Sequence, residues 1–134
     1  MDSKAFDEFL KSGDSLRIYD DGKLIFSSTS DRLLPLLEFM DKYGVSHKDL
    51  IVFDKIIGNA AALLSVKAGC SEACSPLGSE AGAATYGRFG VKYHFVATVP
   101  LIRQPNGEIC PMEKMSAGKE PDEFYAIMKK MLGK

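Results

Sequence analysis

One short segment near the C-terminal end of the chain, Cys110-Pro111-Met112-Glu113, combines a thiol with a carboxyl group. Pro111 suits the first position of a helical turn, which would place Cys110 at the cap of that turn. A helix start and a nearby lysine, here Lys114, both favour the thiolate, which is the reactive form of cysteine. Glu113 can serve as a proton acceptor or donor. The segment therefore predicts a cysteine nucleophile with an acid/base partner. The alternative is that Cys110 is a small, buried apolar side chain.

A second group of polar residues follows the apolar run 50–53. Asp54 and Lys55 place opposite charges on opposite faces of this run, and burying either charge without a partner is costly. We interpret Asp54 as an acid/base group and Lys55 as a partner for an anion or carboxylate. The alternative is a bend at the strand end, with both side chains reaching solvent or capping neighbouring elements. Further candidates for ligand binding lie at predicted helix starts, where free N–H groups can hold an anion: Gly58, Asn59, Ser79 and Glu80. For Ser79 and Glu80 the alternative is an ordinary N-cap followed by an acid in the first turn.

The cysteines and histidines do not have the spacing of a metal site. Cys70 and Cys74 do not form the Cys-x-x-Cys pair of zinc knuckles. His47 and His94 are the only histidines, and neither has a ligand partner at a known spacing. The chain also contains no glycine-rich phosphate loop of the Walker or dinucleotide type. We therefore expect neither a metal nor another cofactor.

The elements that position these residues alternate between helices and strands. Apolar spacing predicts helices over residues 2–11, 33–43, 59–67, 79–89 and 121–132. Strand patterns cover residues 15–19 and 23–27, which are joined by Asp20-Asp21-Gly22, the signal of a β-hairpin. Further strands are predicted over residues 50–57, 72–77 and 93–101. Asp31 is the expected N-cap of the second helix.

This order of elements predicts the α/β class. Strands that alternate with helices of about ten residues form parallel sheets with right-handed crossovers. We predict a three-layer α/β/α domain with a five-stranded mixed sheet and helices on both faces. An antiparallel N-terminal β-hairpin is followed by three parallel strands, 50–57, 72–77 and 93–101. Ligands of open α/β sheets bind beyond the carboxyl ends of the parallel strands. Segments 54–59, 77–80 and 103–113 reach that edge, so we expect the candidate residues to meet there.

Composition sets limits on the partners of the chain. Its 134 residues, 46% hydrophobic and 26% charged, fit a single globular domain over residues 1–134. The formal net charge of -1 disfavours nucleic acid as a general partner. No apolar run approaches the roughly 18 residues that span a bilayer, and residues 1–11 are too charged for a signal core. The three cysteines, an odd number, therefore indicate reduced thiols in a cytoplasm.

Four segments of the chain carry a family resemblance. Residues 54–64 (DKIIGNAAALL), 76–81 (PLGSEA), 99–102 (VPLI) and 110–113 (CPME) resemble those of a prokaryotic domain of unknown function, DUF1893. The resemblance implies a cytidine-deaminase-like fold without the zinc ligands of true deaminases. The helix over residues 59–67 would stand where deaminases carry Pro-Cys-x-x-Cys, but it offers only Asn59 and alanines in that place. The resemblance also makes Cys110 the first candidate for a functional residue. Its implied neighbours are Asp54, Lys55, Gly58, Ser79, Glu80 and Glu113.

Two functions from different classes follow from these features. The first is a cytoplasmic protein with a deaminase-like fold, no zinc site and a pocket centred on Cys110 for a small molecule, including nucleotide-like molecules. If this protein is an enzyme, it uses a cysteine nucleophile and no metal. The alternative is a non-catalytic module that binds or senses a metabolite through the helix starts at Asn59 and Ser79. A purely structural role in a homo-oligomer is a third hypothesis.

Overall fold

The N-terminal part of the sheet is a β-hairpin, as the Asp-Gly turn predicts. The computed structural model describes residues 3–30 and 33–132, so the predicted N-cap Asp31 lies outside the described residues. Strand β1 (Leu16–Asp20) pairs antiparallel with β2 (Lys23–Ser28). Asp21 and Gly22 both have positive φ angles, 50° and 79°, in the connecting turn. Aspartate and glycine tolerate this backbone region, which two-residue hairpins require.

The three predicted parallel strands form the rest of the sheet. Strand β5 (Cys70–Ser79) pairs in parallel with β3 (Leu50–Asp54), with β4 (Ile56–Ile57) and with β6 (Lys92–Val99). Strand β3 joins the hairpin through antiparallel pairing with β1. The sheet has six strands where we predicted five, because Lys55 interrupts the predicted strand 50–57 and separates β3 from β4. The expected parallel arrangement is confirmed.

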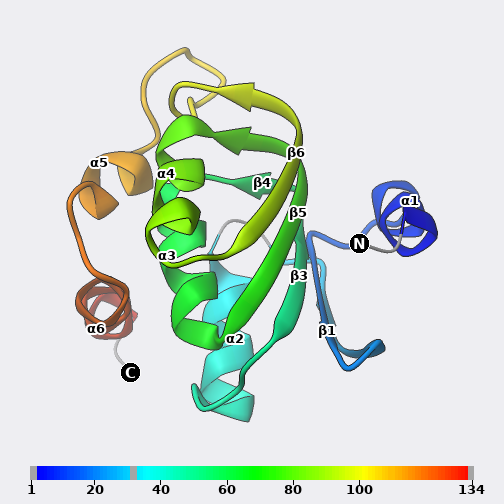
Figure 1. The fold of residues 1–134 in the computed structure, drawn as a ribbon. Coiled ribbons are helices and arrows are strands. Elements are labelled where there is room, and N and C mark those ends of the chain that lie inside the picture. The colour runs from blue at the N-terminus through cyan, green and yellow to red at the C-terminus, as the bar shows by residue number, and fades with distance from the viewer. Residues whose placement is uncertain (1–2, 31–32, 133–134) are drawn as a thin grey trace.

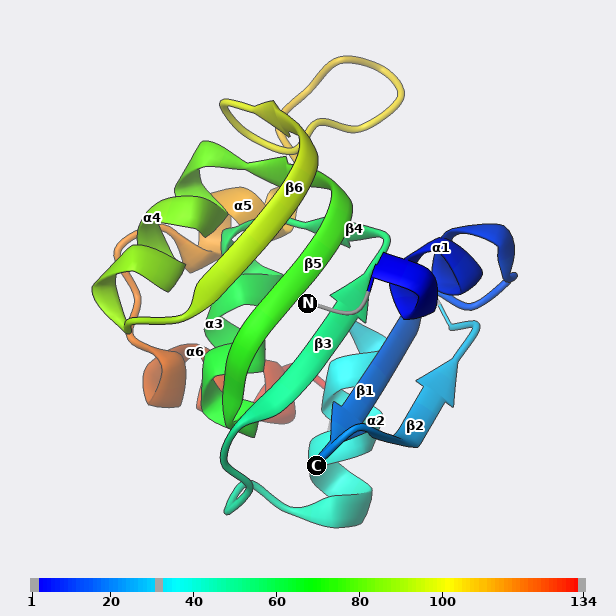
Figure 2. The same ribbon diagram turned by 45° about the vertical axis from the view of Figure 1, so that its right-hand side comes forward.

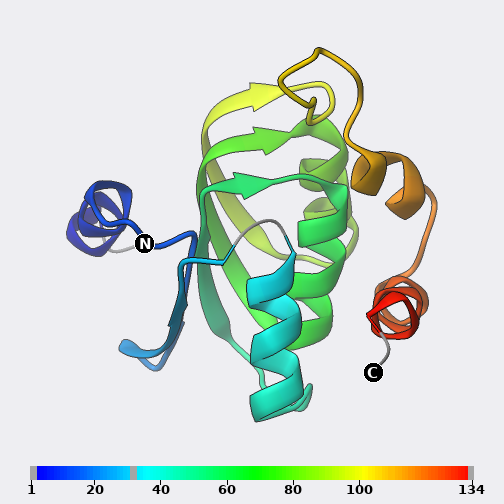
Figure 3. The same cartoon turned by 180° about the vertical axis from the view of Figure 1, so that it is seen from behind.

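The helices are distributed unequally over the two faces of the sheet. Helices α2 (Leu34–Tyr43), α3 (Asn59–Ala68) and α4 (Glu80–Arg88) lie on one face. Helices α5 (Pro111–Ser116) and α6 (Pro121–Met131) lie on the same side, beyond α3 (Figures 1 and 3). Among the helices of residues 3–30 and 33–132, only α1 (Ser3–Lys11) lies on the opposite face, beside β1 and β3 (Figure 2). The predicted helical layers on both faces are therefore present, but the second layer is one helix.

Two apolar clusters fill the space on either side of the sheet. On the α1 side, Phe6 and Phe9 pack with Phe53 and Cys74. The larger cluster contains the nearly completely buried helix α3, whose alanines allow the helix to lie close to its neighbours. None of the helices within residues 3–30 and 33–132 has the length and hydropathy needed to cross a membrane.

The segment between β6 and α6 was predicted as a loop with a helical turn after Cys110. An isolated antiparallel bridge between Arg103 and Ile109 folds this segment back on itself. The turn is the six-residue helix α5, with Cys110 as its N-cap. Proline occupies the first turn, where its missing N–H costs no hydrogen bond. The chain thereby returns from the far edge of the sheet to the start of α3.

Candidate functional site

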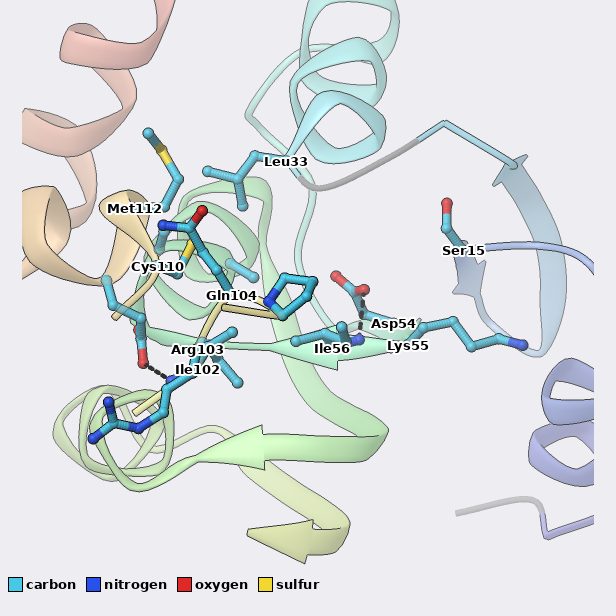
Figure 4. Close-up of a pocket in the computed structure, with 15 residues that line it drawn as sticks. Ser15, Leu33, Asp54, Lys55, Ile56, Ile102, Arg103, Gln104, Cys110 and Met112 are labelled. Atoms are coloured by element: carbon cyan, nitrogen blue, oxygen red, sulfur yellow. Dashed lines mark hydrogen bonds between the residues drawn. The ribbon is translucent and has the colours of Figure 1, made fainter. Parts of the chain in front are cut away.

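A pocket of about 390 Å³ lies at the carboxyl end of β3, where the order of strands and helices predicts a ligand site. It is enclosed by the start of α3, the segment that follows β6 and the start of α5 (Figure 4). Its walls are mainly apolar and include Leu33, Ile56, Ala60, Ile102, Pro105 and Met112. The three predicted catalytic residues, Asp54, Cys110 and Glu113, all line this pocket. A mainly apolar cavity with a few polar groups is the usual form of a small-molecule site.

Asp54 is a buried carboxyl group at the edge of the pocket. It is only 7% exposed, and burial raises its pKa from 3.8 to about 7. The backbone N–H of Ile56 donates a hydrogen bond to Oδ1 at 3.3 Å, and the backbone N–H of Lys55 also donates to the carboxyl group; both lower the pKa but do not cancel the effect of burial. Because the pKa lies near neutrality, Asp54 can both accept and donate a proton under ordinary conditions.

Lys55 lines the pocket, but its ammonium group is engaged elsewhere. The side chain extends away from Asp54 (Figure 4). Its Nζ donates to the backbone oxygens of Leu10 at 3.4 Å and Ser12 at 3.1 Å, and lies 4.8 Å from the centre of the Phe9 ring. The structure therefore uses Lys55 to attach the end of α1 to the sheet and does not place its charge beside Asp54. Lys55 thus lies at the predicted pocket, and the role of its charge as a partner for an anion stays a prediction.

Glu113 lies at the pocket wall, and both of its carboxylate oxygens accept backbone hydrogen bonds. Oε1 accepts from Asn59 N at 2.5 Å, and Oε2 accepts from Ile102 N at 2.8 Å. The residue is 4% exposed. Gly58 makes this contact possible, because a Cβ at that position would lie 2.8 Å from Oε1. Glu113 thus connects α5 to the start of α3 and to the segment after β6, as a positioning residue.

Cys110 is the accessible thiol of the chain. It is half-buried and lines the pocket, whereas Cys70 and Cys74 are buried. Burial raises the pKa of each of these two thiols to about 12. The Cys110 backbone is held firmly, because its N–H donates to Ile102 O at 2.9 Å and its carbonyl accepts from Glu113 N at 2.9 Å. Among the three thiols, Cys110 is therefore the one that a molecule in the pocket can meet.

Comparison with known proteins agrees with this architecture. A family model described as a domain of unknown function, DUF1893, matches residues 4–132. The chain belongs to the DUF1893 family. It is also similar to the crystal structure of a DUF1893 family protein (TM1506) from Thermotoga maritima, with a TM-score of 0.85 and 25% sequence identity. That match covers 96% of this chain and 87% of the other. No curated protein matches. The family that the sequence motifs indicated is confirmed.

Three of the predicted ligand-binding residues have structural roles in this DUF1893 protein. The Asn59 side chain donates to Ser116 O at 2.9 Å and accepts from the Thr85 hydroxyl group, so it connects α3 to α4 and α5. Ser79 is the N-cap of α4, and its Oγ accepts from Gly82 N at 2.9 Å. Glu80 is exposed in the first turn of α4. None of Asn59, Ser79 and Glu80 lines the pocket. For Ser79 and Glu80, the local alternative of a cap and a first-turn acid describes the geometry.

The pocket of this DUF1893 chain also contains residues that the sequence analysis did not single out. Ser15, Gln104 and the apolar wall residues belong to this group. Met112 lies inside the Cys-Pro-Met-Glu segment, so its position in the sequence could have indicated it; Ser15 and Gln104 carried no comparable signal. Arg103 also lines the pocket, but its Nη1 donates to Gly107 O at 2.8 Å. Within residues 3–30 and 33–132, no three His, Cys, Asp or Glu side chains are grouped so that they could hold a metal ion.

Proposed function

We propose that this protein binds a small organic molecule in the pocket between β3, α3 and α5, with Cys110 as the reactive group of the site. One observation carries the proposal: the fold brings Asp54 and Cys110, from distant parts of the chain, to the walls of one largely apolar cavity. The third candidate, Glu113, supports the wall that carries Cys110. The proposal therefore assigns the chemistry to two groups and the positioning to one.

The two groups differ in what they can do. A thiolate at Cys110 is a nucleophile that can form a covalent bond with an electrophilic carbon of a bound molecule. Asp54, with a pKa of about 7, can exchange a proton with that molecule near neutral pH. Glu113 is not assigned a proton-transfer role, because both of its oxygens accept backbone N–H groups.

A non-catalytic binding module is the second candidate. It is favoured by the engagement of Lys55, Asn59 and Glu113 in contacts that build the fold. In that case the molecule would be held by the apolar walls and by Asp54, and Cys110 would be a contact residue. The two candidates differ in one measurable property: an enzyme converts the molecule that it binds, whereas a binding module releases it unchanged.

Three broader assignments are proposals as well. A cytidine-deaminase-like fold is supported by the order of the sheet, in which an antiparallel hairpin precedes three parallel strands. A cytoplasmic location is supported by the reduced state of all three cysteines. A homo-oligomer is supported by the edge strand β6, where Tyr93 and Val96 are exposed.

A thermal-shift screen of small metabolites against the purified protein tests the proposed pocket. Compounds that raise the melting temperature are then examined for protection of Cys110 from alkylation, measured by peptide mass spectrometry. We expect binders that slow alkylation and lose their effect in the Cys110→Ser or Asp54→Asn variant. Incubation of those binders with the protein, followed by analysis of the small molecule, separates conversion from simple binding. Binders that leave the alkylation of Cys110 unchanged would place the function outside this pocket.

A further inference from the structure

We propose that the molecule bound in this pocket carries a positively charged nitrogen group, such as an amine or amidine, and that this group pairs with Asp54. The inference rests on the proposed function and adds the chemical class of the ligand. It follows from the position of one buried carboxyl group and from the directions of the cationic side chains around it.

Asp54 presents its carboxyl group to the pocket from a buried position. The side chain is 7% exposed and lines the cavity, and its carboxyl group points away from the Lys55 side chain (Figure 4). Its carboxyl group accepts hydrogen bonds from two neutral backbone groups, Ile56 N at 3.3 Å and Lys55 N. A buried carboxylate is stable only when a positive charge or strong donors face it. This geometry leaves room in the pocket for such a partner.

The two cationic side chains among the described wall residues are directed to other partners. Lys55 Nζ donates to the backbone oxygens of Leu10 and Ser12, beside α1. Arg103 donates to the carbonyl oxygen of Gly107 within its own loop. The remaining titratable groups on the wall are Cys110 and Glu113, which contribute no positive charge. Within the described walls, neither cation is therefore directed to Asp54, and its carboxyl group is available to a cationic ligand.

The apolar walls increase the effect of this charge. Ile56, Ile102 and Met112 line the same cavity, so a bound ligand would have largely apolar surroundings. A charge pair in such surroundings is stronger than the same pair in water. A cationic nitrogen would stabilise the ionised form of Asp54, whereas a carboxylate or phosphate would be repelled by it. The site would thus discriminate between ligands by their charge.

Three fragments of nearly identical shape test this inference: benzamidine, benzamide and benzoate, with charges of about +1, 0 and -1 at neutral pH. Binding is measured by NMR titration of backbone amides at the pocket, including those of Ile56 and Ile102. At about pH 8 we expect benzamidine to bind about tenfold more tightly than benzamide, and benzoate to bind most weakly, because a charge-assisted hydrogen bond is stronger than a neutral one. The preference should decrease toward about pH 6, as Asp54 becomes protonated.

Asp54→Asn should abolish both the preference and its pH dependence. Asp21→Asn is the matched control, since it removes one negative charge from the exposed hairpin turn, where asparagine also tolerates the positive φ. Benzoate binding as tightly as benzamidine would overturn the charge preference and leave the pocket intact. Saturable binding of none of the three fragments would overturn the pocket itself, and the inference with it. The pH dependence in the wild-type protein decides the question even if the Asp54→Asn variant does not fold.

Discussion

Replacing Glu113 with alanine tests whether its carboxylate holds the site together. The carboxylate is 4% exposed and accepts two backbone hydrogen bonds, from Asn59 N at 2.5 Å and from Ile102 N at 2.8 Å. A hydrogen bond to a charged group contributes roughly 1.5–3 kcal/mol to stability. Glu113→Ala leaves a buried N–H group, that of Asn59, and a partly buried one, that of Ile102, without their acceptors, so we expect the free energy of unfolding to fall by about 3–6 kcal/mol.

Glu113→Gln separates the shape of the side chain from its hydrogen bonding. The glutamine oxygen can accept one N–H, but the amide NH₂ group then faces the other, so the expected loss is roughly half that of the alanine variant. Glu108→Ala in the exposed loop is the control, with an expected change within about 0.5 kcal/mol. Urea unfolding followed by circular dichroism measures all three variants. A Glu113→Ala protein within about 1 kcal/mol of the wild type would refute the positioning role.

Three more outcomes follow from the same geometry. Burial raises the pKa of Asp54 from 3.8 to about 7, so the folded protein retains a proton that the unfolded chain releases between these values. The free energy of unfolding should therefore fall by up to about 4 kcal/mol between about pH 4 and pH 7, and Asp54→Asn should remove this fall. Urea unfolding at several pH values measures the free energy in both proteins. The same pH dependence in the variant as in the wild type would contradict the prediction. Iodoacetamide should label Cys110 before Cys70 and Cys74, which are buried. Peptide mass spectrometry identifies the labelled thiol. Labelling of either buried thiol before Cys110 would contradict the proposed site at Cys110. Gly69→Ala should destabilise the fold by at least about 2 kcal/mol in thermal or urea unfolding. Gly69 has a φ of 104°, and a Cβ there would lie 2.0 Å from a backbone carbonyl oxygen. An unchanged stability would show that the backbone at this position can relax.

Several features of this protein could be predicted from the sequence because they depend on local backbone chemistry or on periodicity. The Asp21-Gly22 turn requires positive φ angles, which few residue types tolerate, so the hairpin is visible in the sequence. The helices between β3, β5 and β6 require crossover connections, and those connections make the three strands parallel. The parallel order also indicated the sheet edge at which Asp54 and Cys110 meet.

The directions of the side chains were decided by the tertiary structure. Lys55 follows Asp54 directly, yet its ammonium group bonds to the end of α1, and that contact exists only because α1 packs on the sheet beside β3. Glu113 resembles an acid/base group in sequence, but the start of α3 presents an N–H that its carboxylate accepts. Sequence pattern reports which face or edge a residue occupies. Which partner a polar side chain finds depends on elements that are distant in the chain and adjacent only after folding.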